Sequence, residues 1–169
     1  MQETLTRTLA LMRHGEAEEA SPDYSRKLTW KGEEQVYSVA EQLQQKHLTF
    51  DLILASAASR TMQTASIIHG YFEHAPQLLV SPHLYNFSFG TCQEVLDLLR
   101  TDIQSILIVG HNPGISRVSN QISQEKLYFS TAHCTIMQKD TSPSNPLSQA
   151  ILQDGWTFLH SIAPKNNSI

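Results

Sequence analysis

The sequence of 169 residues is poor in cysteine, in charge and in long apolar runs. Its two cysteines, Cys92 and Cys134, are too few for a disulfide scaffold and too far apart for a CxxC motif. Charged residues make up only 17%, and the net charge of -4 argues against a non-specific nucleic-acid binder, which needs a basic face. No stretch approaches the roughly 20 apolar residues of a membrane span.

The N-terminus, residues 1–4, also lacks the basic start and apolar middle of a signal peptide. We therefore expect a cytoplasmic protein with no nucleic-acid or membrane partner. The apolar fraction of 40% is that of a globular protein, and the length suits one domain over residues 1–169 with its own core. A monomer or a weak dimer is the expected oligomeric state.

Strand-like and helix-like segments alternate along the chain. Short apolar runs predict strands at residues 8–12, 51–55, 77–80 and 105–109. Helical spacing of apolar residues follows at 29–43, 59–68, 95–99 and 113–122, and two edge strands are predicted at 134–139 and 156–160, joined by a loop over 141–148. This alternation predicts an α/β fold, a three-layer α/β/α arrangement around a mostly parallel central sheet.

Several helix features can be predicted residue by residue. Thr29 is expected to cap the first helix. Met62 is expected on the buried face of the second helix, together with Ala65 and Ile68. Asn112 is expected to cap the helix that follows residue 112, with a proline at its first position.

Polar clusters follow three of the predicted strands. They are Arg13-His14, Ser59-Arg60 and His111-Asn112. Because ligands of such folds bind at the carboxyl ends of the strands, we expect these side chains to converge. Each cluster alone is also compatible with an ordinary polar turn or helix start, so the coincidence of the three carries the interpretation.

The residue types in these clusters suit phosphoryl transfer. An arginine offers a planar fork matched to phosphate oxygens, and a neutral imidazole is a good nitrogen nucleophile. Two arginines and two imidazoles around a tetrahedral phosphoryl dianion can position it and neutralise its charge without a metal ion. The remaining histidines show no metal-ligand spacing, so no metal and no cofactor are expected.

Three ordered motifs carry a resemblance to a known family. They read Leu-Met-Arg-His-Gly-Glu at 11–16, Ser-Arg-Thr-Met-Gln-Thr-Ala at 59–65 and Val-Gly-His-Asn-Pro-Gly at 109–114. Together they resemble the histidine phosphatase (phosphoglycerate mutase-like) superfamily, from residue 9 to about residue 122. The short chain and the Ser-Arg-Lys-Leu-Thr segment at 25–29 are most similar to the SixA-type phosphohistidine phosphatases. The resemblance implies a phosphoglycerate mutase-like fold.

The resemblance also implies roles for individual residues. His14 would be the nucleophile and become transiently phosphorylated, with Arg13 and Arg60 clamping the phosphoryl oxygens. His111 would be the second histidine of the pocket. Three further residues are candidates for binding the substrate: Arg26, Gly15 and Asn112.

The sequence departs from the larger members of the family in the loop after the third strand. Those members carry an acidic residue there, the proton donor to the leaving group. Here residues 82–86 read Pro-His-Leu-Tyr-Asn, and no carboxylate precedes Glu94. An alkoxide needs that proton, whereas imidazole leaves readily once protonated. This favours phosphohistidine, or another activated phosphoryl donor, over sugar phosphates. The short chain, without large insertions that would roof the pocket, favours a phosphorylated protein as the partner that carries it. The alternatives are a phosphomonoesterase for small phosphorylated substrates and a non-catalytic phosphate-binding module. The roles of His83 and Tyr85 stay open.

Overall fold

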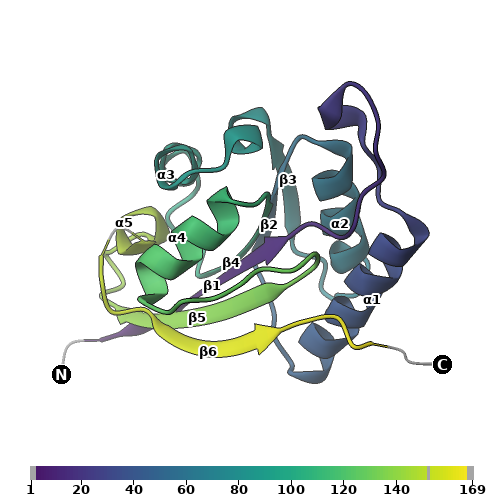
Figure 1. The fold of residues 1–169 in the computed structure, drawn as a ribbon. Helices are drawn as coiled ribbons and strands as arrows, with labels where there is room; N and C mark the ends of the chain where they lie inside the picture. Colours follow the sequence, from purple (N-terminus) through teal and green to yellow (C-terminus); the bar gives the residue numbers. More distant parts are fainter. Residues whose placement is uncertain (1–2, 152, 167–169) are drawn as a thin grey trace.

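The computed structural model describes residues 3–151 and 153–166, which form one central sheet flanked by helices (Figure 1). The elements in chain order are β1 (Leu5–Arg13), η1 (Asp23–Ser25), α1 (Trp30–Gln45), β2 (Leu52–Ser56), α2 (Ser59–His69), β3 (Gln77–Ser81), η2 (Pro82–Asn86), α3 (Phe89–Asp97), β4 (Ser105–Gly110), α4 (Gly114–Ser123), β5 (Cys134–Thr141), α5 (Leu147–Ile151) and β6 (Thr157–Ile162). Here η denotes a short 3₁₀ helix.

The sheet has the strand order β3-β2-β4-β1-β5-β6. β1 pairs parallel with β4, and β2 pairs parallel with both β4 and β3, whereas β5 and β6 are antiparallel. The predicted α/β fold with a mostly parallel sheet is therefore confirmed. The prediction of two edge strands near the C-terminus is half wrong, because β5 lies between β1 and β6 and only β6 is at the edge.

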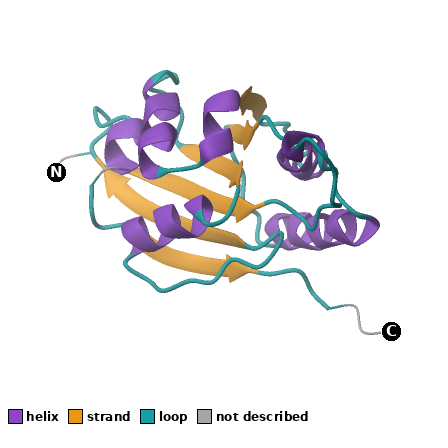
Figure 2. Cartoon of the chain, turned by 45° about the horizontal axis from the view of Figure 1, so that its top comes forward, coloured by secondary structure: helices purple, strands orange, loops and turns teal. Residues whose placement is uncertain are grey.

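Side chains of the central strands alternate between two hydrophobic cores, as the two-residue period of a strand requires. One core, with Leu9, Leu54 and Ile108, packs against α3, α4 and α5. The other, with Met12, Ile53 and Val109, packs against α1 and α2. Figure 2 shows the helices on the two sides of the strands, the three-layer arrangement that the sequence predicts.

Of the two predicted helix N-caps, one is confirmed and the other is wrong. The Thr29 hydroxyl accepts a hydrogen bond from the Gly32 backbone N–H, so Thr29 caps α1 as predicted. Asn112 does not cap α4. Pro113 occupies the N-cap position, and the side-chain amide of Asn112 donates to the carbonyl of Phe129 instead. The Asn112 amide thus binds a loop that is distant in the sequence.

Residue Met62 is half-exposed at 38%, so its predicted place in the core is wrong. The buried face of α2 is centred on Thr61, Thr64, Ala65 and Ile68, which leaves Met62 at its edge. The buried threonines explain the shift, since each hydroxyl is satisfied by a backbone carbonyl of the same region.

α3 begins earlier than the helix predicted at 95–99, and α5 overlaps the loop predicted at 141–148. α3 begins at Phe89 because Ser88 and Thr91 form a capping box, and it ends before Leu98, which is exposed rather than helical. The loop predicted at 141–148 is shortened by α5. In both places polar residues that suit a turn also suit a helix start, and the packing of the following apolar residues decides between the two.

Candidate active site

The predicted polar clusters meet at the carboxyl ends of β1, β2 and β4. β1 pairs Arg13 with Gly110 at the end of β4, so His14 and His111 follow neighbouring strand ends. Their imidazole rings are 5.4 Å apart, centre to centre, and are steeply inclined to each other. Arg60 lies in the first turn of α2, directly after β2.

The ring of His14 is held in one orientation. Its Nδ1 is 2.7 Å from the carbonyl oxygen of Gly15, and a carbonyl only accepts, so Nδ1 donates and Nε2 keeps its lone pair. His14 is only 8% exposed. Burial, together with the nearby guanidinium groups of Arg60 and Arg13, lowers the pKa of His14 to about 4, against the opposing effect of the Gly15 carbonyl. At neutral pH the imidazole is therefore uncharged.

Gly15 positions the histidine through close packing. A Cβ at Gly15 would lie 2.6 Å from the Gly32 carbonyl oxygen, and a Cβ at Gly32 would lie 2.0 Å from the Glu16 carbonyl oxygen. The Gly15 backbone N–H donates to the hydroxyl of Thr64 on α2. The turn after β1 is thus pressed against α1 and tied to α2.

The carbonyl of Phe129 binds two of the predicted site residues, Arg13 and Asn112. It accepts a hydrogen bond of 3.0 Å from Nη1 of Arg13 and one of 2.9 Å from the amide of Asn112. Within the described part of the chain, Nε of Arg13 and Oδ1 of Asn112 are buried and have no partner. Burial lowers the pKa of Arg13 from its usual value. The hydrogen-bonding capacity of these two side chains is therefore only partly used within the described residues.

Arg60 is buried, and Asp23 of η1 binds it twice. Nη1 donates to the Asp23 carbonyl at 2.9 Å, and Nη2 donates to Oδ2 of the same residue at 3.0 Å. A guanidinium has five N–H donors, so three remain. One of these, Nε–H, is buried and unpartnered among the described residues.

The ring of His111 contacts β2 and η2. Its Nε2 is hydrogen-bonded to the Ser56 hydroxyl at 2.8 Å, and the ring of Tyr85 packs against it with centroids 5.6 Å apart. Burial, followed by the nearby His14 and Arg60, lowers the pKa of His111 to about 3. Its buried Nδ1 has no partner in the described residues.

Two glycines hold the turn that carries His111 against Phe87, which follows η2. A Cβ at Gly110 would lie 2.5 Å from the Phe87 ring, and one at Gly114 would lie 1.9 Å from the Phe87 carbonyl oxygen. The loop that carries Tyr85 and the turn that carries His111 therefore pack as one unit.

Arg26 lies at the rim of the site and has three partners. Its guanidinium donates to the Glu18 carbonyl at 2.7 Å, to Oδ1 of Asp23 at 3.2 Å and to Glu19 at 3.3 Å. Arg26 thus steadies the η1 loop and its aspartate, and its charge is close enough to lower the pKa of His14.

Two groups of this site are not predicted from the sequence. Tyr85, whose role stayed open, donates its hydroxyl proton to Oδ2 of Asp23, a residue not considered at all. His83, the other open residue, is exposed and away from these contacts. The hydrogen bonds from Tyr85, Arg26 and Arg60 hold the pKa of Asp23 well below its usual range, and Asp23 in turn raises the pKa of Tyr85. Asp23 stands three residues before Arg26 in a polar loop, and no local pattern points to its contact with α2.

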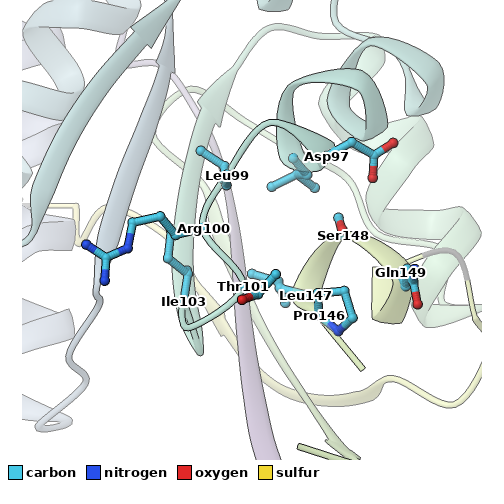
Figure 3. Close-up of a pocket in the computed structure, with 10 residues that line it drawn as sticks. Asp97, Leu99, Arg100, Thr101, Ile103, Pro146, Leu147, Ser148 and Gln149 are labelled. Carbon is cyan, nitrogen blue, oxygen red and sulfur yellow. The ribbon is translucent and has the colours of Figure 1, made fainter. Parts of the chain in front are cut away.

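Other features of the described chain lie apart from this site. No helix of residues 3–151 and 153–166 combines the length and apolar character needed to cross a bilayer. Nor do these residues include a group of three or more histidine, cysteine or acidic side chains that could hold a metal ion. The cavity of about 340 Å³ in Figure 3 lies between α3 and α5, near Ile103 and Leu147, at the amino end of β4. It shares no residue with the clusters above.

Comparison with known proteins agrees with this geometry. Residues 9–106, more than half of the chain, match the histidine phosphatase superfamily (branch 1). No match was found among curated protein sequences. The chain therefore belongs to the histidine phosphatase superfamily on the basis of the family match.

Three solved structures are similar over nearly the whole chain. One is described as a candidate phosphohistidine phosphatase SixA from Nakamurella multipartitia, with 24% identity, a TM-score of 0.76, and 94% of this chain and 96% of that chain covered. A second bears the same description, from Agrobacterium tumefaciens, with 24% identity, a TM-score of 0.76 and coverage of 94% and 98%. The third is the protein histidine phosphatase SixA complexed with tungstate, with 20% identity, a TM-score of 0.75 and coverage of 93% and 97%. At these identities the likeness shows the fold.

Proposed function

We propose that this protein is a metal-independent phosphatase that forms a covalent phosphohistidine intermediate on His14 and removes the phosphoryl group from phosphohistidine in a protein. The observation that carries the proposal is the state of His14: a neutral ring whose Nδ1–H is bound to the Gly15 carbonyl, so that Nε2 is free to attack. Membership of the histidine phosphatase superfamily and the likeness to SixA structures support it.

The surrounding residues supply what phosphoryl transfer requires. Arg13 and Arg60 both keep a buried, unpartnered Nε–H among the described residues, and His111 keeps an unpartnered Nδ1. We expect Arg13 and Arg60, whose charges act on His14, to neutralise the charge on the phosphoryl oxygens, and the neutral ring of His111, 5.4 Å from that of His14, to add a hydrogen bond. Asn112 holds the loop that Arg13 also binds, and Gly15 fixes the attacking ring.

The reaction proceeds in two displacements at phosphorus. In the first, Nε2 of His14 bonds to phosphorus, the substrate P–N bond breaks, and its electron pair stays on the leaving nitrogen. In the second, water attacks phosphorus, the electron pair of the P–Nε2 bond returns to His14, and the water proton passes to the phosphate or to solvent. Inorganic phosphate is the product.

The available acids favour a nitrogen leaving group. The loop after β3 contributes a phenol, Tyr85, whose pKa is raised by its hydrogen bond to Asp23. The pKa of Asp23 is held far below its usual range, so its carboxylate carries no proton to donate at neutral pH. An alkoxide leaving group would find only this weak acid, whose proton is already donated to Asp23, whereas a protonated imidazole leaves without a further donor.

The first experiment compares three substrates in the presence of a chelator: a phosphohistidine peptide, p-nitrophenyl phosphate and a sugar phosphate. We expect chelator-resistant hydrolysis of phosphohistidine and little ester hydrolysis, and His14→Ala should reduce turnover by a factor of about 10⁴ or more. Trapping the phosphoenzyme after mixing with labelled phosphohistidine, in the wild type but not in His14→Ala, tests the covalent step.

Other outcomes would favour the alternatives. Equal or faster ester hydrolysis would identify a phosphomonoesterase for small substrates. Phosphate binding without hydrolysis of any of the three substrates would identify a phosphate-binding module.

A further inference from the structure

Asp23 lies at the outer edge of the arginine cluster. Its side chain is 50% exposed, whereas that of its partner Arg60 is 7% exposed. The carboxylate joins three segments, since it belongs to η1 and is bound by Arg60 of α2 and Tyr85 of η2. It thus lies between the buried arginine and solvent.

The carboxylate of Asp23 still has room for another donor. An ionised carboxylate offers about four lone-pair sites. Oδ2 accepts from Tyr85 and Arg60, and Oδ1 accepts from Arg26 at 3.2 Å. Oδ1 therefore retains acceptor capacity on a half-exposed group.

A negative charge at this place has opposite effects on two kinds of substrate. Attack by Nε2 of His14 in line with the breaking bond puts the leaving atom on the side of phosphorus opposite His14. A phosphorylated imidazole with a proton on its other nitrogen has a cationic ring that presents an N–H donor. When its P–N bond breaks, the electron pair stays on the ring, and neutral imidazole departs with that proton in place. A phenolate or alkoxide departs with growing negative charge, which a carboxylate repels.

We propose that Asp23, oriented by Tyr85, is the specificity-determining residue of the leaving-group side: it accepts a hydrogen bond from the protonated imidazole of the substrate and thereby selects phosphorylated nitrogen over phosphate esters. The inference rests on the proposed function of the His14 site and adds the group that distinguishes its substrates. It also accounts for an otherwise unfavourable feature, a carboxylate beside residues that bind a phosphoryl dianion.

The test measures kcat/KM on a phosphohistidine peptide and on p-nitrophenyl phosphate for Asp23→Asn, which keeps the size and one acceptor oxygen but removes the charge. Glu19→Gln is the matched control, because Glu19 also contacts Arg26 but not Arg60 or Tyr85. We expect the ratio of the two kcat/KM values to fall by a factor of about ten or more in Asp23→Asn, through loss of phosphohistidine hydrolysis. The ratio in Glu19→Gln should equal that of the wild type. Tyr85→Phe should shift the ratio in the same direction by a smaller factor.

An equal loss on both substrates would overturn the inference, because it would mean that Asp23 only positions Arg60. An unchanged ratio would overturn it as well. Should Asp23→Asn fail to fold, as judged by circular dichroism, the ratio in Tyr85→Phe decides. A wild-type protein without His14-dependent phosphohistidine hydrolysis would refute the proposed function together with this inference, whereas His14-dependent hydrolysis with an unchanged ratio refutes the inference alone.

Discussion

Each end of β1 carries an arginine, buried at the amino end and half-buried at the carboxyl end, and the two arginines are bound in different ways. Near the amino end, Arg7 is 1% exposed, and its guanidinium donates to the carbonyls of Ile103 and Asn145 at 2.7 and 2.9 Å and to the Thr141 hydroxyl at 3.4 Å. At the carboxyl end, Arg13 donates to one carbonyl and keeps a buried Nε–H that has no partner in the described part of the chain.

The difference shows how a structural cation is distinguished from a ligand-binding one. Burial is not the distinguishing feature, since Arg7 is the more buried of the two. A buried donor without a partner is costly, so folding leaves such donors mainly where a ligand will satisfy them. On this basis we propose that Arg13 and Arg60 bind the ligand, whereas Arg7, whose guanidinium is bound by three protein acceptors, belongs to the framework.

Arg60→Met provides the strongest test of this comparison. Arg60 is expected to bind the phosphoryl oxygens, so its loss should lower kcat/KM by a factor of about 10² to 10³. Its partner Asp23 is half-exposed and is solvated when the arginine is removed, so the thermal midpoint should change little. Steady-state kinetics and thermal unfolding of the same preparation measure both quantities. A large drop in the midpoint with nearly normal kcat/KM would assign Arg60 to the framework.

The two histidines at the carboxyl ends of β1 and β4 should also make the stability of the protein depend on pH. The pKa values of His14 and His111 are lowered to about 4 and about 3, so below pH 6.5 the unfolded chain binds protons that the folded chain does not. The free energy of unfolding should fall as the pH falls from 6.5 to 4, by up to about 2.7 kcal/mol per pH unit for the two rings. Urea unfolding at several pH values measures this slope. The double variant His14→Asn, His111→Asn should have a shallower slope, and an unchanged slope would contradict the assignment.

Arg7→Met should give the reverse of the Arg60 result. It leaves the buried carbonyls of Ile103 and Asn145 without their donors, at a cost of about 2 kcal/mol. The thermal midpoint should fall by about 4–8 °C, and kcat/KM well below that midpoint should be unchanged. Reduced kcat/KM in fully folded Arg7→Met would show that the two ends of β1 are coupled.

Arg26→Ala should have the smallest effect. Arg26 is partly exposed and pairs with Asp23 and the highly exposed Glu19, and exposed ion pairs contribute about 0.2–1 kcal/mol. We expect kcat/KM to fall by a factor of about 1.4 to 5, the kinetic equivalent of that energy. A loss as large as that of Arg60→Met would place Arg26 in direct contact with the phosphoryl group.

The sequence predicted those parts of the molecule that depend on the strands and on the residues at their carboxyl ends. The strand ends carry Arg13, His14 and His111, and the parallel pairing of β1, β2 and β4 is sufficient to bring them together. Asp23 and Tyr85 could not be predicted in this way. They lie in two loops that meet only in the folded chain, and neither loop has a periodicity that fixes its path.

The errors in the helices have a similar origin. Asn112 has the local character of an N-cap, yet the distant Phe129 carbonyl takes its amide. Met62 has the spacing of a core residue, but buried Thr61 and Thr64 displace it to the edge of the helix face. In each case a tertiary partner outweighs a local preference of about 1 kcal/mol.

The close packing of Phe87 on Gly110 and Gly114 also bears on the local stability of the two segments that border the site. The segment with Tyr85 is anchored to the core through Leu84 and Phe87, both buried, so its amides exchange with solvent only when that core opens. The segment 18–27 is mostly exposed and is attached to α2 through polar contacts of Asp23, so it opens locally and at lower free energy. Amide hydrogen exchange should therefore be slow in the segment with Tyr85 and fast in the segment 18–27. A bound phosphoryl group should slow exchange mainly in the segment 18–27.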